Sequence, residues 1–352
     1  MTSSAPHPIH APGEAQLACA ELGPALDFFV GELGFRIEAI FPADDPQVAT
    51  LSGHGLRLRL TPGGDPGVLR IPSPDAGRTL TAPNGTRIEL VDPDPPLDVP
   101  PLAPAFVLTR ATDGPAAGQG RAGMLYRDLI PSRLGGRFIA SHISIPQGGP
   151  VADWVHFHKV RFQMIFCRAG WVRLVYEDQG EPFVLSAGDF VLQPPRIRHR
   201  VLESSPGLEV VEIGCPALHE TLADHDMALP TGRILPDRDF GRQTFIRHVA
   251  GETPWTPWGD GFEAQESGMT GATRGLAGVR VLRPAGKRAF RAVADPEGEL
   301  MFGFVLEGAA RLEHGGVHAL SACDAFVIPP GAAWRLSEAS DDLRLLQVVL
   351  PG

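Results

Sequence analysis

Several features are absent from this sequence, and each absence excludes a class of protein. No run approaches the roughly 18 apolar residues that a membrane-spanning helix needs. The opening residues, MTSSAPHPIHAPGEAQ, lack the basic start and apolar core of a signal peptide. No lysine- and arginine-rich block stands out in a chain of net charge −10, which argues against a nucleic-acid partner. The 4 cysteines have no C-x-x-C spacing, which favours buried, reduced thiols. We therefore expect a cytoplasmic protein that binds neither membranes nor nucleic acids.

The sequence is instead rich in residues that interrupt secondary structure. It contains 41 glycines and 35 prolines among 352 residues, and these separate short apolar runs. Such a pattern is typical of many short strands joined by tight turns. The length predicts two or three domains. We therefore expect a mainly β protein.

The N-terminal third divides into a tail, a module and a connector. Residues 1–12 are polar and proline-rich, and we expect them to be disordered. Residues 13–92 predict a strand, a helix that ends near Gly34 and then further strands, which is an α+β unit of βαβββ order. Residues 93–121 are rich in proline, glycine and alanine and predict a linker.

The module at 13–92 resembles half of a vicinal oxygen chelate (glyoxalase-like) fold. The segment LDFFVGELGF is similar to that family's helix, and APNGTRIELVDP to its closing strand. The resemblance implies metal-ligand positions at Glu14, where the family usually has histidine, and at Glu89. Members of the family need two such halves, and only one is found here. The module would therefore pair with another subunit or serve as a metal-free accessory domain.

An internal repeat follows the linker. GWVRLVYEDQGEPFVLSAGDFVLQPPRIRH matches EGAARLEHGGVHALSACDAFVIPPGAAW in the same order of strand, hairpin and proline-terminated strand. We therefore predict two similar all-β units at 122–228 and 262–352, joined by a turn-rich bridge at 229–261.

Three histidines in the first repeat unit predict a metal site. His156 and His158 are two residues apart, so on a strand both side chains point to one face, with Cα atoms about 6–7 Å apart. Two imidazoles at this spacing can converge on one ion. His199 follows on another strand, after Pro194 and Pro195 have stiffened the approach. We predict one divalent metal ion at the three rings.

Gln163 stands five residues beyond His158. This odd offset would place its side chain on the opposite face of a continuous strand. A turn or bulge through residues 159–161 must therefore intervene if Gln163 is to join the histidines.

These residues resemble the two motifs of the cupin superfamily. The first motif, Gly, H-x-H, Glu and Gly, falls on Gly149, His156, His158, Gln163 and Gly170. The second falls on Gly188, Pro194 and His199. The resemblance implies two tandem double-stranded β-helix barrels, a bicupin, with Gln163 in the place of the usual glutamate ligand. In the second barrel the corresponding positions are Ala294, Pro296, Met301 and Trp334, so we expect that barrel to be metal-free and to support packing or a homodimer.

Three imidazoles and a neutral amide would leave the ion with its full charge of two. Such a centre polarises carbonyl groups and suits a chelating anionic substrate. We favour Fe(II), although Zn, Mn, Ni and Cu also accept imidazole-rich sites. The resemblance allows a mononuclear dioxygenase-type oxidoreductase acting on a small metabolite. An isomerase, an epimerase, a lyase, a non-catalytic binding protein and a purely structural metal site remain alternatives.

Four further side chains are candidates for substrate binding. Arg161, Arg173 and Arg198 are close to the histidines in sequence, and a guanidinium can bind a carboxylate with two hydrogen bonds. Tyr176 could act as an acid or a hydrogen-bond donor. The alternative is that the arginines are solvated and that Tyr176 packs in the core.

Overall fold

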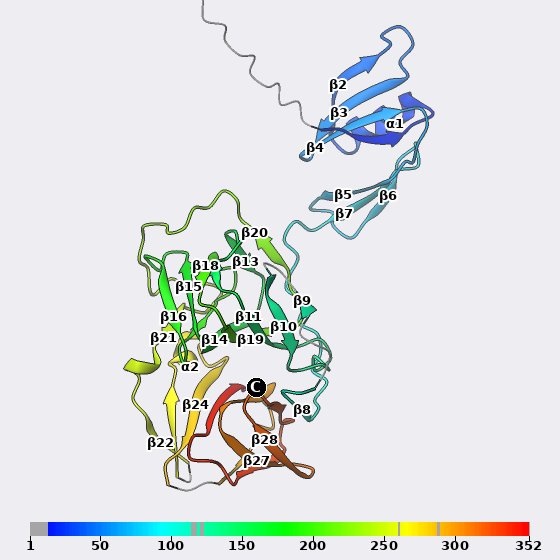
Figure 1. Cartoon of the computed structure of the whole chain (residues 1–352). Coiled ribbons are helices and arrows are strands. Elements are labelled where there is room, and N and C mark those ends of the chain that lie inside the picture. The colour runs from blue at the N-terminus through cyan, green and yellow to red at the C-terminus, as the bar shows by residue number, and fades with distance from the viewer. Residues whose placement is uncertain (1–12, 114–117, 120–122, 260, 287–288, 352) are drawn as a thin grey trace, which may run out of the picture. The chain divides into compact units, whose positions relative to one another are not determined.

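A computed structural model describes residues 13–113, 118–119, 123–259, 261–286 and 289–351. They belong to two compact units, Met1–Pro96 and Leu97–Gly352 (Figure 1). The tail at 1–12, which we expect to be disordered, lies outside the described residues, as do 114–117 and 120–121 of the predicted linker and residue 122 of the predicted first barrel. Among the helices of the described part, none has the length and apolar composition to cross a bilayer.

The first five elements of the N-terminal unit have the predicted βαβββ order, and three more strands follow. Its first sheet runs β1-β4-β3-β2, with β1 parallel to β4. The elements are β1 (Ala15–Ala18), α1 (Leu22–Gly31), β2 (Arg36–Phe41), β3 (Val48–Gly53) and β4 (Leu56–Thr61). Helix α1 buries Leu22, Ala25 and Phe29, which are spaced along one face of a helix. Gly34 follows the helix with a φ of 73°, a backbone conformation that favours glycine.

A second, three-stranded sheet completes this unit. It has the order β5-β7-β6, from β5 (Val68–Pro72), β7 (Arg87–Val91) and β6 (Thr79–Thr81). Glu14, which precedes β1, pairs with Arg57 of β4 at 2.9 Å. Glu89 on β7 pairs with Arg70 of β5 at 3.4 Å. Both candidate ligands of this module are therefore engaged with arginine. The similarity to the vicinal oxygen chelate fold stays a prediction.

The second unit consists of two β-barrels, which confirms the predicted fold class. In the first barrel a seven-stranded sheet has the order β21-β17-β14-β19-β11-β10-β9, and it faces a sheet of order β16-β15-β18-β13-β20. The bounds of its strands are β9 (Gly118–Gln119), β10 (Leu125–Asp128), β11 (Ile139–Ile145), β12 (Gly149–Pro150, paired with β18), β13 (His156–His158), β14 (Phe162–Ala169), β15 (Trp171–Tyr176), β16 (Phe183–Ser186), β17 (Phe190–Leu192), β18 (His199–Ser204), β19 (Leu208–Cys215), β20 (Thr221–Ala223) and β21 (Ile246–His248).

The second barrel repeats this plan. Its large sheet has the order β22-β23-β24-β31-β26-β29-β8, and its small sheet β25-β30-β27-β28. The bounds are β8 (Val107–Thr109), β22 (Thr256–Trp258), β23 (Phe262–Glu266), α2 (Met269–Ala272), β24 (Gly278–Pro284), β25 (Phe290–Val293), β26 (Leu300–Glu307), β27 (Ala309–Glu313), β28 (Val317–Ser321), β29 (Ala325–Val327), β30 (Ala333–Ser337) and β31 (Arg344–Leu350).

The two barrels exchange edge strands through the segments that we predicted to be connectors. β8 lies within the predicted linker and pairs with β29 of the second barrel, while β21 lies within the predicted bridge and pairs with β17 of the first. Each strand has only three residues, so neither shows an alternation long enough to be read from the sequence. These parts of the linker and the bridge are therefore structural parts of the barrels.

One hydrophobic core joins the barrels. On β14, Met164 and Phe166 point into it, and on β26, Phe302 and Phe304 do so. The alternate residues of the same strands point into the barrels instead, because neighbouring side chains on a strand face opposite ways. Each large sheet is therefore buried on both faces.

An ion-pair cluster also links the barrels, and it predicts a pH dependence of stability. Arg161 and Arg137 both donate hydrogen bonds to Glu299, at 2.5 and 2.7 Å. Burial alone would raise the pKa of Glu299, but the two guanidinium groups outweigh it, and the pKa is lowered from 4.5. A carboxylate with a lowered folded-state pKa stabilises the fold above the unfolded-state value, and this contribution is lost as the pH falls through the folded-state pKa.

We expect Glu299→Gln to lower the free energy of unfolding at neutral pH by about 1.5–3 kcal/mol, since hydrogen bonds to a charged group are lost. The difference from the parent should shrink as the pH falls below 4.5 toward the lowered folded-state pKa of Glu299, where the parent's carboxylate also becomes protonated. Urea unfolding across pH measures both effects, with the exposed Glu297→Gln as the control. An equal loss in both variants, or a loss that does not change with pH, would contradict the assignment.

Candidate metal centre

Neighbouring strands of the first barrel's smaller sheet, β16-β15-β18-β13-β20, bring the three histidines together. His156 on β13 is the direct cross-strand partner of His199 on β18, and His158 lies two residues further along β13. The ring centroids of His156 and His199 are 4.2 Å apart, and those of His158 and His199 5.4 Å. One ligand nitrogen from each buried ring lies within 4.8 Å of the others. Nitrogens bound at about 2.1 Å to a shared ion have separations in this range.

Backbone carbonyl groups set the orientation of all three rings. The Nδ1 atoms of His156, His158 and His199 lie 2.8, 3.1 and 3.0 Å from the carbonyl oxygens of Trp154, Glu220 and Ile197. Each Nδ1–H therefore donates to a carbonyl, which leaves the Nε2 lone pair as the available acceptor. This is the neutral tautomer that a metal-binding histidine uses, and the second hydrogen bond holds the ring in place.

The rings line a small cavity inside the first barrel. Its volume is ≈ 80 Å³, and its walls are mostly aliphatic, including Ile143, Val172 and Leu174. Gln193 also lines it, and both atoms of the Gln193 side-chain amide are buried with no hydrogen-bond partner among the described residues. Unpaired buried polar atoms are costly and indicate a ligand or water.

Gln163 enters the same cavity by the route that its offset requires. Residues 159–161 separate β13 from β14, so the chain passes from the small sheet to the large one before Gln163. The Gln163 amide Nε2 donates to Glu212 Oε1 at 2.5 Å. Because the amide nitrogen is engaged, the Gln163 carbonyl oxygen is the atom that can turn toward an ion.

Glu212 is a site residue that the sequence analysis missed. It lies on β19 opposite Ile165 of β14 and lines the cavity. Its presence changes the expected charge, because a carboxylate now stands beside a donor set that we predicted to be wholly neutral. The signal was available in LEVVEIGC, where Leu208, Val210 and Glu212 alternate toward one face.

Tyr176 is the one predicted substrate-binding residue that lines the cavity. Its ring stacks on His199, with centroids 5.5 Å apart, and its hydroxyl has no hydrogen-bond partner within the described part of the chain. Burial raises the pKa of Tyr176, and the Glu212 carboxylate raises it further. The phenol therefore keeps its proton at neutral pH and can donate a hydrogen bond into the cavity.

The three predicted arginines lie elsewhere. Arg173 is on the outer face of β15, where it pairs with Glu203 at 3.1 Å, because its neighbours Val172 and Leu174 take the inner face. Arg198 pairs with Asp224 at 3.0 Å and covers the Phe157 ring. Arg161 binds Glu299 of the second barrel at 2.5 Å. Proximity in sequence therefore did not place these side chains at the cavity.

A fourth histidine lies at the edge of the site. The ring centroids of His158 and His219 are 5.3 Å apart, and His219 Nδ1 lies 2.9 Å from the Pro216 carbonyl oxygen. His219 is half-buried and follows β19 in the segment CPALHE. No periodic pattern in that segment indicates its position.

The second barrel has apolar side chains at the positions that correspond to the metal ligands, and most of them line a cavity of ≈ 240 Å³. Met301 and Trp334, which stand at the former ligand positions, are buried, and Trp334 packs edge-on against Phe290 with centroids 5.1 Å apart. Gln347 occupies the place that Glu212 has in the first barrel, opposite Gly303. Within the described residues, these positions therefore offer no imidazole to a metal ion.

This geometry defines the class of protein: a two-barrel β fold with an imidazole cluster inside one barrel. Residues 141–213, which include all three histidines, match the family model described as Cupin domain. A search of curated proteins returned no match.

Solved structures share the two-barrel fold. A structure of oxalate decarboxylase from Bacillus subtilis at pH 4.6 aligns with a TM-score of 0.51 and 11% identity, over 74% of this chain and 79% of that one. Another structure of the same enzyme, determined to study its Mn(II) centres, aligns with a TM-score of 0.51 and 12% identity, over 72% and 78%. The likeness shows the fold. The chain is thus similar to cupin proteins in the sequence of residues 141–213 and in its two-barrel fold.

Proposed function

We propose that the chain binds one divalent transition-metal ion at His156, His158 and His199 and acts as a metal-dependent enzyme on a small anionic metabolite. The observation that supports this most is the convergence of three neutral imidazoles whose tautomers are set by backbone carbonyls. A purely structural site would be closed by protein ligands, whereas here orphaned polar atoms of Gln193 and Tyr176 face the same cavity.

The chain's own residues would hold and orient the substrate. The Tyr176 hydroxyl and the Gln193 amide can bind its oxygen atoms, and the aliphatic walls exclude water. Glu212, held by Gln163, can accept a proton or balance the charge of the centre. The metal, when bound, would polarise the chelated oxygens and supply the redox chemistry. The ≈ 80 Å³ cavity suits a substrate of a few heavy atoms.

We propose a mononuclear dioxygenase-type reaction with Fe(II) as the resident ion. Imidazole ligands suit iron, and an apolar cavity favours a small, weakly polar molecule such as dioxygen. The Mn(II) of the structurally similar oxalate decarboxylase supports a divalent ion without choosing among metals. An isomerase, an epimerase or a lyase would use the same ligands, and a binding protein would use them without turnover. We further propose a cytoplasmic homodimer.

Oxygen uptake by anaerobically purified, Fe(II)-loaded protein tests the reaction. On addition of 1,2- or 1,3-dicarbonyl acids or catechols, the parent chain should consume oxygen with saturation kinetics. Glu212→Gln should lower kcat by about 10²–10⁴-fold, the range for removing a general acid or base, while the metal content stays unchanged. Glu203→Gln, on the outer face, is the matched control. Conversion of substrate without oxygen uptake would favour an isomerase or lyase, and binding without conversion a non-catalytic protein.

A further inference from the structure

A second, larger cavity lies in the two-barrel unit, apart from the metal centre. Its volume is ≈ 660 Å³, and it shares no lining residue with the histidine cavity. Its walls come from the β13–β14 connection, the β17–β18 loop, the bridge before β21, the segment after α2 and the two ends of the unit. Ligand-binding pockets typically have about 300–1,000 Å³, so this cavity can hold a whole metabolite.

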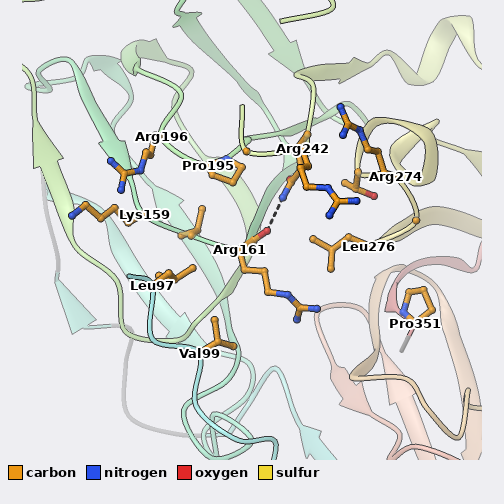
Figure 2. A pocket seen from close by; sticks show the side chains of 15 residues that line it. Leu97, Val99, Lys159, Arg161, Pro195, Arg196, Arg242, Arg274, Leu276 and Pro351 are labelled. Carbon is orange, nitrogen blue, oxygen red and sulfur yellow. Dashed lines mark hydrogen bonds between the residues drawn. The ribbon is translucent and has the colours of Figure 1, made fainter. Parts of the chain in front are cut away.

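The charge of this cavity is of one sign. Its lining includes five cationic side chains and no carboxylate: Lys159, Arg161, Arg196, Arg242 and Arg274. The whole chain, by contrast, carries a net charge of −10. Lys159 and Arg196 lie on one side of the pocket, Arg242 and Arg274 on the other, with Arg161 between them (Figure 2).

Four of the five cationic side chains have interaction partners, Lys159 and Arg196 among them. Arg161 is paired with Glu299, and Arg274 with Asp239. Within the described part of the chain, the Arg242 guanidinium has no ion-pair or hydrogen-bond partner. Gathering five cations around one cavity whose lining has no carboxylate is unfavourable, and an anionic ligand would relieve the repulsion.

The backbone beneath the arginines is a second, independent observation. Arg196, Arg242 and Arg274 have φ values of 63°, 70° and 53°, in the left-handed region where glycine is the residue without strain. Three arginines are thus kept at positions that glycine would occupy more easily, and all three side chains border one cavity. Strained residues of this kind concentrate at ligand sites.

The remaining walls suit an organic ligand. Leu97, Val99, Pro195 and Leu276 provide apolar surface beside the cations. Gln243 donates from Nε2 to the Arg161 carbonyl oxygen at 2.7 Å, which fixes the bridge to the β13–β14 connection (Figure 2). The pocket therefore offers cations for anionic groups and apolar contacts for a carbon skeleton.

We propose that this pocket binds a small organic molecule with at least two phosphate or carboxylate groups. The backbone N–H of Arg196 donates to the His158 carbonyl oxygen at 2.9 Å, so the pocket wall is bonded directly to the strand that carries two candidate metal ligands. The inference does not depend on the proposed function, since the pocket shares no lining residue with the metal centre.

Isothermal titration calorimetry of the full chain with fructose bisphosphate, and separately with tricarballylate, tests the proposal. At least one probe should bind with a Kd below about 1 mM at physiological salt, and the preferred probe identifies phosphate or carboxylate as the recognised group. Arg242→Gly should weaken binding by about tenfold, and Arg196→Gly with Arg242→Gly and Arg274→Gly by about a hundredfold or more. These variants should fold, because glycine relieves the left-handed backbone.

Two controls make the result specific to the pocket. Arg133 also has a positive φ, 51°, but pairs with Asp128 away from the cavity, so Arg133→Gly should bind the probe as the parent does. His199→Ala should also retain binding, which separates this site from the metal centre. The proposal is overturned if neither probe binds, if the triple glycine variant binds as tightly as the parent, or if His199→Ala abolishes binding.

Discussion

Replacing His156 or His199 by alanine should reduce the bound transition metal from about one equivalent per chain to less than about a tenth. The two rings face each other across β13 and β18, and both are buried at 1% and 4% exposure. Removal of either leaves two imidazoles, which are too few to retain an ion through purification. Elemental analysis of protein purified without oxygen measures the loss.

His314→Ala in the second barrel is the matched control, and its metal content should equal that of the parent. Because backbone carbonyls hold the rings without the help of an ion, the apo variants should stay folded, and circular dichroism can verify this. A parent protein with no bound transition metal, or alanine variants that keep it, would remove the basis of the proposed function. The proposed ligand site at Arg196, Arg242 and Arg274 would remain testable in that case.

Replacing Phe302 by alanine should lower the free energy of unfolding by about 3–5 kcal/mol. Phe302 on β26 has 0% exposure and packs in the core shared by the two barrels. The substitution removes a ring from between two large sheets, and each of these sheets is buried on both faces. The surrounding structure can therefore collapse only a little into the cavity that is left. Urea unfolding followed by tryptophan fluorescence gives the value.

Val317→Ala, at a side chain with 63% exposure in the same barrel, should change the free energy of unfolding by less than about 0.5 kcal/mol. A small effect of Phe302→Ala, similar to that of the control, would mean that the barrels are held together by other contacts. The ion pairs from Arg161 and Arg137 to Glu299 are then the next candidates.

Local periodicity determined much of this protein. Strand alternation in WVHFH predicts that the His156 and His158 side chains share one face of the strand. The internal sequence repeat predicts the second barrel. The same alternation would have excluded Arg173, since Val172 and Leu174 are apolar on both sides of it. It would also have indicated Glu212 as an inward-facing carboxylate on an apolar strand.

What the sequence could not decide depends on contacts between segments far apart in the chain. Only the tertiary structure shows that β8, which precedes the first barrel in the chain, pairs with the second barrel, and that β21, which precedes the second barrel, pairs with the first. Only pairing of β14 with β19 brings Glu212 to Gln163. The cationic pocket likewise gathers Arg196, Arg242 and Arg274 from separate loops. The direction of a side chain follows from the two-residue repeat within one strand, so it can be read from the sequence. Which strands pair is decided by the burial of apolar surface from several distant segments, so only the tertiary structure shows it.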